Sequence, residues 1–260
     1  MSWSAQTKTL KGASGIAAIL LLWQLSVYVV DVPPHFYPSP AAVWRAFIEM
    51  TEKGILPSYI ADSMLRYLLG VLIGTAIGCA LALLIASSKL AMRMLGPMID
   101  FLYYMVELAW IPLFVIWFGF GLPTILVAVV YVVIWPVLFN SLSGIRSIQP
   151  SLILAARSLG GSRWQVLREV VLPGMLPQAV NGFRVAAGFA FRALIFGELI
   201  GAQSGIGYLI FESTTHLQTD RTVLGMICMG LLWLFIDRNY LRPFEKATID
   251  RWGMVVSHDS

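Results

Sequence analysis

Six apolar stretches, each long or nearly long enough to cross a bilayer as a helix, constrain the fold of this chain more than any other feature. They cover residues 15–30, 64–86, 97–118, 124–142, 176–202 and 223–236. A spanning helix needs about 20 predominantly apolar residues. Hydrophobic residues make up 58% of the chain and charged residues 12%, whereas soluble domains carry about 25% charged residues. The sequence therefore predicts an all-α integral membrane protein with about six transmembrane helices.

The predicted spans and their short connections use almost all of the chain. A separate soluble domain of about 100 residues does not fit beside them, so we expect a short segment at 1–14 and one transmembrane domain at 15–260. The first apolar run lacks a small-x-small cleavage site, which indicates a retained span rather than a signal peptide. Cys79 and Cys228 lie inside apolar runs and are expected to be buried thiols.

The distribution of Lys and Arg predicts the orientation of the chain. Twelve of the 18 fall in segments on the same side as the N-terminus, three fall on the opposite side, and three lie within predicted spans. Cytoplasmic loops carry an excess of Lys and Arg, so both termini are expected in the cytoplasm. The segment 1–14 and the connection between the fourth and fifth spans are then cytoplasmic as well.

Two segments on the opposite side have local patterns of their own. Residues 41–51 form an amphipathic pattern, and we expect a short helix at the membrane interface with Trp44 among the lipid head groups. Farther along the chain, Gly205 and Gly207 predict a turn that is followed by a short helix.

Small and charged residues inside the spans predict how the helices pack. Gly70, Gly74 and Gly78 recur every four residues on one face of the second span, which favours close approach of a neighbouring helix. Arg66, at the start of the same span, is expected to pair with a carboxylate. Arg184, near the cytoplasmic end of the fifth span, is expected to reach the interface or to form a structural pair.

The connection between the fourth and fifth spans is basic although the chain as a whole is apolar. Its central stretch, LAARSLGGSRWQVLREVVLPGMLP (residues 154–177), predicts two short helices separated at Gly160 and Gly161. Ser162 is the expected N-cap of the second helix. The prolines expected to interrupt the chain before the fifth span are Pro173 and Pro177. By arginine content alone, the segment is compatible with an ordinary cytoplasmic surface loop.

The spacing within this loop points to a family. An Ala-Ala pair at 155–156 is followed after three residues by Gly160, and after nine more by Val-Val-Leu-Pro at 170–173. This pattern resembles the "EAA…G…I-x-LP" signature of importer-type ABC transporter permeases. The chain departs from the signature in having Leu154 for the leading Glu and Val170 for the Ile.

Further stretches extend the resemblance over most of the chain. They are similar to the branch of these permeases associated with nitrate, alkanesulfonates, taurine and related small anions. The three stretches are SMLRYLLGVLIGTAIG (63–78), AWIPLFVIWFGFG (109–121) and ELIGAQSGIGYLI (198–210).

The resemblance implies a type I importer (MetI-like) permease fold in the inner membrane of a prokaryote. It implies a second permease chain, usually identical, with the pathway for a small anionic solute at the interface of the two. Two cytoplasmic ATPase subunits and an extracytoplasmic binding protein would complete the importer. No G-x-x-x-x-G-K-[ST] motif occurs in the sequence. The chain is therefore expected not to be an enzyme and to bind no cofactor, with ATP used by its partners; lipid surrounds it, and no nucleic acid is expected.

The resemblance also assigns the cytoplasmic loop, residues 146–175, to docking on the ATPase subunit. The residues expected to take part are Ala155, Ala156, Gly160, Arg163, Trp164, Leu167, Leu172 and Pro173. The small residues would allow close approach, while Trp164 and Leu167, one turn apart, would act as anchors. The alternative is that these two side chains pack on the spans of their own chain.

Polar and aromatic residues inside the spans are the candidates for the solute pathway. A charge at the bilayer centre costs about 2.5–3.5 kcal/mol on insertion scales, so each should face protein or water. The candidates are Tyr103, Tyr104, Glu107, Trp110, Arg192 and Glu198. Arg192 is the residue expected to attract an anion. Glu107 fits an anionic solute poorly: it forms a structural pair with Arg66 or Arg192, lines a gate, or indicates a solute other than a simple anion, such as an aromatic acid or a vitamin precursor.

Three other functions are compatible with an apolar chain of this length. An intramembrane enzyme needs a nucleophile and base, or a metal-ligand cluster, at matched depths, and the sequence offers neither. A self-contained secondary transporter usually has internal repeats with interrupted helices, and no convincing repeat is present. A simple membrane anchor would not need the Ala-Ala…Gly…Leu-Pro loop.

Overall fold

The computed structural model describes residues 15, 18–29, 33 and 36–244, and every regular element in this part of the chain is helical. The expected cytoplasmic segment at 1–14 lies outside the described residues. After an apolar helix at Ala18–Val29, the elements are α2 (Pro40–Glu52), α3 (Ile55–Ser87), α4 (Lys89–Tyr104), η1 (Glu107–Trp110), α5 (Ile111–Phe118), α6 (Leu122–Ser147), α7 (Pro150–Ser158), α8 (Arg163–Val166), η2 (Leu167–Val171), α9 (Leu172–Gly201), α10 (Ile206–Thr215), α11 (Thr219–Ile236) and η3 (Asp237–Leu241).

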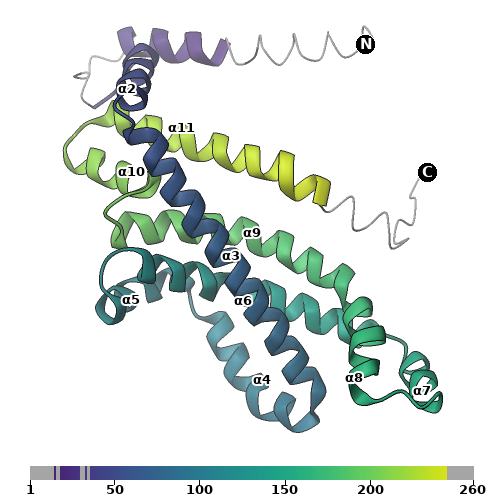
Figure 1. Ribbon diagram of the computed structural model, residues 1–260. Helices are drawn as coiled ribbons and strands as arrows, with labels where there is room; N and C mark the ends of the chain where they lie inside the picture. The colour runs from purple at the N-terminus through teal and green to yellow at the C-terminus, as the bar shows by residue number, and fades with distance from the viewer. Residues whose placement is uncertain (1–14, 16–17, 30–32, 34–35, 245–260) are drawn as a thin grey trace, which may run out of the picture.

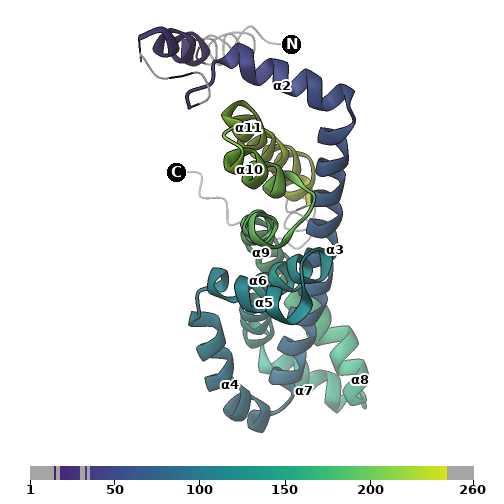
Figure 2. The ribbon, with the colours of Figure 1, turned by 90° about the vertical axis from the view of Figure 1, so that its left-hand side faces the viewer.

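The axes of α6, α9 and α11 are roughly parallel, with the chain direction of α9 opposite to that of the other two, and α3 crosses them along one side (Figures 1 and 2). At one end of this stack lie α5 and α10, and at the other end α7 and α8 extend away from it. The largest hydrophobic cluster forms where α3, α6 and α9 meet, and it includes Val129, Val133, Ala190 and Leu194. This cluster fixes the helices that carry the polar residues considered below.

The predicted glycine ridge on α3 packs against α6, as its spacing indicated. A Cβ atom on Gly74 would lie 2.6 Å from the Cβ of Val133, and one on Gly70 would lie 2.5 Å from a methyl carbon of Val129. Such separations are shorter than any van der Waals contact between carbons, so only glycine allows the two helices to lie this close.

Three helices are long and apolar enough to cross a membrane: Ile55–Ser87, Leu122–Ser147 and Thr219–Phe244. Two bent pairs raise the number to five if each pair is one span. These are Leu90–Tyr104 with Glu107–Phe118, and Arg163–Gly201 with Ile206–Thr215. The shorter apolar helix Ala18–Val29 falls within the first predicted span. Helix α3 begins at Ile55, nine residues before the second predicted span, 64–86.

The prediction of one continuous span at 97–118 was wrong. Helix α4 ends at Tyr104, and Met105 and Val106 are extended before η1 begins at Glu107. The two halves meet at an angle of 90°. Neither Gly nor Pro occurs at the break, so the sequence carried no local signal for it.

The prediction that two prolines interrupt the chain before the fifth span was also wrong. One helix runs from Arg163 to Gly201 through α8, η2 and α9. Pro173 occupies the first turn of α9, directly after the π-helical turn η2. A π turn is wider and shifts the hydrogen-bond register by one residue, which accommodates a residue that has no N–H to donate.

The two short helices expected on the side opposite the N-terminus, at residues 41–51 and after Gly205 and Gly207, are present as α2 and α10. In α2 the apolar face, with Val43, Ala46 and Met50, packs against α10 and α11, whereas Trp44 is exposed. The carboxylate of Glu49 lies 2.6 Å from the Lys53 ammonium, which holds the pKa of Glu49 below its usual value. The turn at Gly205 leads into α10.

Glycine 74 provides a test of the α3–α6 packing. We expect Gly74→Ala to destabilise the chain by about 1–3 kcal/mol, the usual cost of overpacking a filled interface. Gly230→Ala on α11 is the matched control, because a Cβ there has open space around it and alanine favours helix more than glycine. Thermal unfolding in detergent measures both variants, and a Gly74→Ala protein as stable as the control would contradict the packing described here.

Candidate functional site

A buried ion pair joins α3 to the end of α9. Glu198 is 0% exposed, and the Arg66 guanidinium donates to its Oε1 at 2.8 Å. The hydroxyl of Ser63 donates to the same carboxylate at 2.9 Å, and the Gly207 N–H donates to Oε2 at 2.9 Å. Arg66 also donates to the carbonyl and the hydroxyl of Ser204, each at 2.7 Å. Both oxygens of this carboxylate thus accept hydrogen bonds from protein groups.

This network fixes the bend between α9 and α10. Gly205 has φ +106°, and a Cβ on Gly207 would lie 2.6 Å from the Cβ of Glu198. The two glycines therefore allow the chain to turn back directly over the carboxylate. The expectation that Arg66 pairs with a carboxylate is confirmed. Glu198, expected in the solute pathway, lies in this buried network instead, and Ser63, one turn before Arg66, was missed by the sequence analysis.

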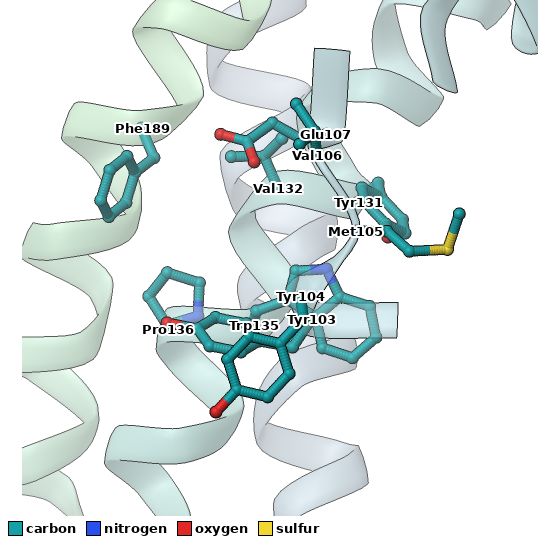
Figure 3. Close-up of a pocket in the computed structure, with 10 residues that line it drawn as sticks. All are labelled: Tyr103, Tyr104, Met105, Val106, Glu107, Tyr131, Val132, Trp135, Pro136 and Phe189. Atoms are coloured by element: carbon teal, nitrogen blue, oxygen red, sulfur yellow. The ribbon is translucent and has the colours of Figure 1, made fainter. Parts of the chain in front are cut away.

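The break after α4 opens into a pocket of about 390 Å³ (Figure 3). Residues 103–107 form one wall, a turn of α6 around Tyr131 and Trp135 forms another, and Phe189 on α9 faces them. Non-helical backbone at membrane depth is tolerated where it borders a cavity or is covered by protein. The Tyr131 hydroxyl supports the end of α4 by donating to the carbonyl of Leu102 at 2.7 Å.

The pocket brings together three of the predicted pathway residues: Tyr103, Tyr104 and Glu107. The Glu107 carboxylate points toward the side where Phe189 lies (Figure 3). Its side chain is exposed and forms no hydrogen bond or ion pair with the rest of the described chain, so neither Arg66 nor Arg192 is its partner.

Two other predicted residues lie behind or beside the pocket. Trp110 does not line it but packs on Phe114 and Tyr131, with ring centroids 5.9 and 5.7 Å away. Arg192 places its guanidinium carbon 5.6 Å from the centre of the Phe189 ring. The sequence analysis missed Tyr131, Trp135 and Phe189. Tyr131 and Trp135 are four residues apart and therefore lie on one face of their helix, a spacing that could have indicated a shared pocket wall.

The loop between α6 and α9 is a second candidate site. Helix α7 ends in a Schellman motif: the Gly161 N–H donates to the Ala156 carbonyl and the Gly160 N–H to the Arg157 carbonyl, both at 3.0 Å. Gly160 has φ +83°, the left-handed conformation that this motif requires. Ser162 then caps α8 and forms a capping box with Gln165. The two short helices, the glycine break and the N-cap are confirmed.

Large apolar side chains on this loop face away from the helical stack. Leu159 is 89% exposed, Trp164 is 65% exposed and Leu154 is 62% exposed. Trp164 therefore does not pack on the spans of its own chain, which removes the alternative weighed for it. Between α7 and α8 lies a shallow groove of about 270 Å³ that includes Ala156 and Gly160. Exposed apolar side chains around a groove are typical of a protein–protein contact.

Neither site offers a metal-binding cluster. Within residues 36–244 and the shorter described segments before them, no three His, Cys, Asp or Glu side chains are close enough to hold a metal ion. Cys79 and Cys228 are both free thiols.

Comparisons with known proteins agree on one family. Residues 70–240 match the model of the "binding-protein-dependent transport system inner membrane component" family. The putative aliphatic sulfonates transport permease protein SsuC of Escherichia coli is 36% identical over 84% of this chain and 83% of its own length. The taurine transport system permease protein TauC of Escherichia coli is 28% identical over 97% and 94%. The bicarbonate transport system permease protein CmpB of Synechococcus elongatus is 30% identical over 77% and 70%.

Solved structures support the same fold. An amino acid ABC transporter crystallised with histidines superposes with a TM-score of 0.58 at 20% identity, over 77% of this chain and 97% of that one. The MetNI methionine ABC transporter, in inward-facing conformations, superposes with a TM-score of 0.50 at 23% identity, over 70% and 91%. The predicted MetI-like fold is confirmed by these likenesses.

The buried ion pair generates a stability prediction. Glu198→Gln keeps the shape of the side chain but leaves Arg66, 8% exposed, without its counter-charge. We expect a loss of about 3–5 kcal/mol, as when one partner of a buried pair is removed. Thermal or denaturant unfolding in detergent measures the loss.

Glu49→Gln is the control for this prediction, because it removes a carboxylate from the exposed pair with Lys53. That variant should unfold like the parent, since exposed pairs contribute little. The double variant Arg66→Leu/Glu198→Leu, which leaves no buried charge unpaired, should be more stable than Glu198→Gln. Equal stability of Glu198→Gln and the parent chain would show that the pair does not hold α3 to α9.

Proposed function

Because the chain belongs to the binding-protein-dependent transport system inner membrane components and is a multi-pass permease subunit of an ABC importer, we propose that it forms the pathway for a small anionic solute and couples that pathway to separate ATPase subunits. Permease subunits of this family have no ATPase site of their own. The transmembrane domain in this proposal is residues 15–260, with the coupling loop at 146–175.

The solute class rests on the relatives. Their names refer to aliphatic sulfonates, taurine and bicarbonate, all of which carry an anionic group. Nitrate belongs to the same chemical class of small anions. Arg192, an exposed cation beside the pocket at the α4 break, provides a favourable charge for such a solute.

One structural observation carries the coupling proposal. The helix that begins in the exposed loop at Arg163 continues without interruption to Gly201. It therefore connects Trp164, on the proposed docking surface, to Phe189 in the pocket wall and to Glu198 in the buried network. A displacement of the loop by an ATPase subunit moves the same rigid helix that borders the pocket, as in hinge and shear transitions.

The proposed docking surface combines a groove with apolar anchors. Ala155, Ala156 and Gly160 carry little or no side chain, so a partner can approach the backbone of the α7–α8 turn closely. Trp164 supplies a large exposed ring, the kind of residue that dominates protein contacts. Arg163 adds a positive charge at the rim, and Leu167 lies half-buried one turn after Trp164. Leu172 and Pro173 stiffen the passage into α9.

The complete importer in this proposal contains two copies of the chain. The pocket at the α4 break is open to the surface of the single chain, and aromatic residues around it, including Tyr104, are exposed. A second copy facing this side would enclose a pathway between the two chains. Two ATPase subunits on the side of α7 and α8, and a binding protein on the side of α2 and α10, complete the assembly.

A charge inserted at Gly160 tests the docking surface. Gly160 and Gly54 both have positive φ and open space for a side chain. Gly54 follows α2 and Gly160 follows α7, and these two helices lie at different ends of the molecule (Figure 1). We expect Gly160→Asp to abolish co-purification with the ATPase subunit and to reduce solute uptake at least tenfold, because it places volume and a carboxylate in the docking groove.

Gly54→Asp is the matched control and should retain both ATPase binding and uptake. Size-exclusion chromatography of the two variants checks that each is folded. Wild-type uptake and ATPase binding by Gly160→Asp would overturn the proposed coupling surface.

A further inference from the structure

Two pockets follow one another along the same face of α6. The pocket at the α4 break, here called the outer pocket, is lined from α6 by Tyr131 and Trp135 (Figure 3). A second pocket of about 350 Å³, here called the inner pocket, is lined from α6 by Phe139, Ser143 and Arg146. These positions are three or four residues apart, so one face of the helix borders both pockets. The inner pocket lies toward the end of α6 that leads into the α7–α8 loop.

Helix α4 borders the same two pockets in the matching order. Gly96, Ile99 and Asp100 line the inner pocket. Tyr103 and Tyr104, at the end of the helix, line the outer pocket. Both α4 and α6 thus run past the two pockets in turn, as expected for two chambers of one pathway.

Both pockets contain ionisable side chains that need water. Glu107 in the outer pocket and Asp100 and Arg146 in the inner pocket are exposed. None of the three forms an ion pair within the part of the chain that the structure describes. A charge at membrane depth is unfavourable unless protein or water satisfies it. We therefore expect both pockets to be hydrated.

The border between the two pockets is aromatic. Tyr103, in the wall of the outer pocket, meets Phe139, in the wall of the inner pocket. The two rings are packed edge to face, with centroids 4.9 Å apart and an interplanar angle of 67°. An anion that moves from one hydrated pocket to the other has to pass these rings, and they cannot replace the water that it loses. Apolar constrictions of this kind close channels by excluding water.

The two rings are held to different degrees. Phe139 is half-buried in the middle of α6, beside the fully buried Leu138. Tyr103 is 46% exposed and belongs to the last turn of α4, just before the extended residues Met105 and Val106. Residues at the end of an element often act as hinges, because they absorb a change in backbone angles. Rotation at this break moves Tyr103 while α6 keeps Phe139 in place.

We infer that Tyr103 and Phe139 form a barrier in the solute pathway. In contact, the two rings separate the outer pocket from the inner one, and the solute passes when Tyr103 moves away from Phe139. This inference rests on the proposed function, which places the pathway along this side of the chain, and it names the residues that close it. In the orientation proposed above, the inner pocket faces the cytoplasm, and each of the two copies contributes one such pair.

Access to the outer pocket from the cytoplasmic side tests the barrier. The reporter is Val106→Cys, because Val106 is 65% exposed in the wall of the outer pocket. It is placed in the permease–ATPase complex with Cys79 and Cys228 changed to serine. Inverted vesicles receive a membrane-impermeant, negatively charged methanethiosulfonate, with no nucleotide or with a non-hydrolysable ATP analogue. In at least one of these two states, Phe139→Ala should raise the labelling rate by about tenfold or more, because the reagent passes where the ring was.

Three further variants separate a barrier from general loosening of the fold. Phe139→Tyr keeps a ring and should be labelled as slowly as the parent. Phe101→Ala is the matched control, since it removes an exposed ring of α4 that lines neither pocket, and it should leave the rate unchanged. Tyr103→Ala removes the other ring and should accelerate labelling as Phe139→Ala does, so the test does not depend on a single variant. Size-exclusion chromatography checks that each variant is folded.

Equal labelling rates for the parent, Phe139→Ala and Tyr103→Ala in both nucleotide states would reject the barrier. ATP-driven uptake by the parent importer with its binding protein tests the proposed function separately, with an aliphatic sulfonate, taurine and bicarbonate as probes. Uptake of one of them together with equal labelling rates leaves the proposed function standing. Uptake of none of them rejects the proposed solute class, whereas the labelling rates still decide whether the rings separate the two pockets.

Discussion

A bilayer offers no water to polar groups, and this constraint explains the main features of the structure. Charge inside the helical stack is kept where protein can satisfy it: Arg66 and Glu198 neutralise each other, and Ser63, Ser204 and Gly207 supply the remaining hydrogen bonds. Backbone that leaves the helical ladder is found where it borders a pocket, at Met105 and Val106. The pair also fixes the bend between α9 and α10, which sets where the long helix of the fifth span ends.

The same long helix joins the two candidate sites. It starts on the exposed loop at Arg163, passes the pocket wall at Phe189 and ends beside Glu198. The π turn η2 accommodates Pro173 without ending the helix, so the loop and the span form one continuous helix. The Arg66 network holds the far end of this helix to α3. In the proposed coupling, motion of the loop would be transmitted along α9 toward the pocket while the Arg66 network restrains the other end of the helix.

Sequence reasoning predicted the features that depend on local pattern. The apolar runs, the glycine ridge on α3, the turn at Gly160 with its N-cap at Ser162, and the pairing of Arg66 with a carboxylate all follow from spacing or from the cost of an unpaired charge. The features that it missed depend on tertiary contacts. The α4 break contains neither Gly nor Pro, and support comes from the Tyr131 hydroxyl, 29 residues away. Periodicity placed Glu198 on a face of its helix, but only the packed structure shows that this face meets Arg66 and not the pocket.

The central claim is that the α7–α8 turn lies in the cytoplasm and contacts an ATPase subunit. Labelling of a cysteine in place of Leu159, which is 89% exposed, tests that claim most directly, in a background where Cys79 and Cys228 are serine. A membrane-impermeant maleimide should label Leu159→Cys in inverted vesicles but not in intact cells, and bound ATPase subunit should protect it. Labelling in intact cells would place the turn on the opposite side of the membrane and contradict the account.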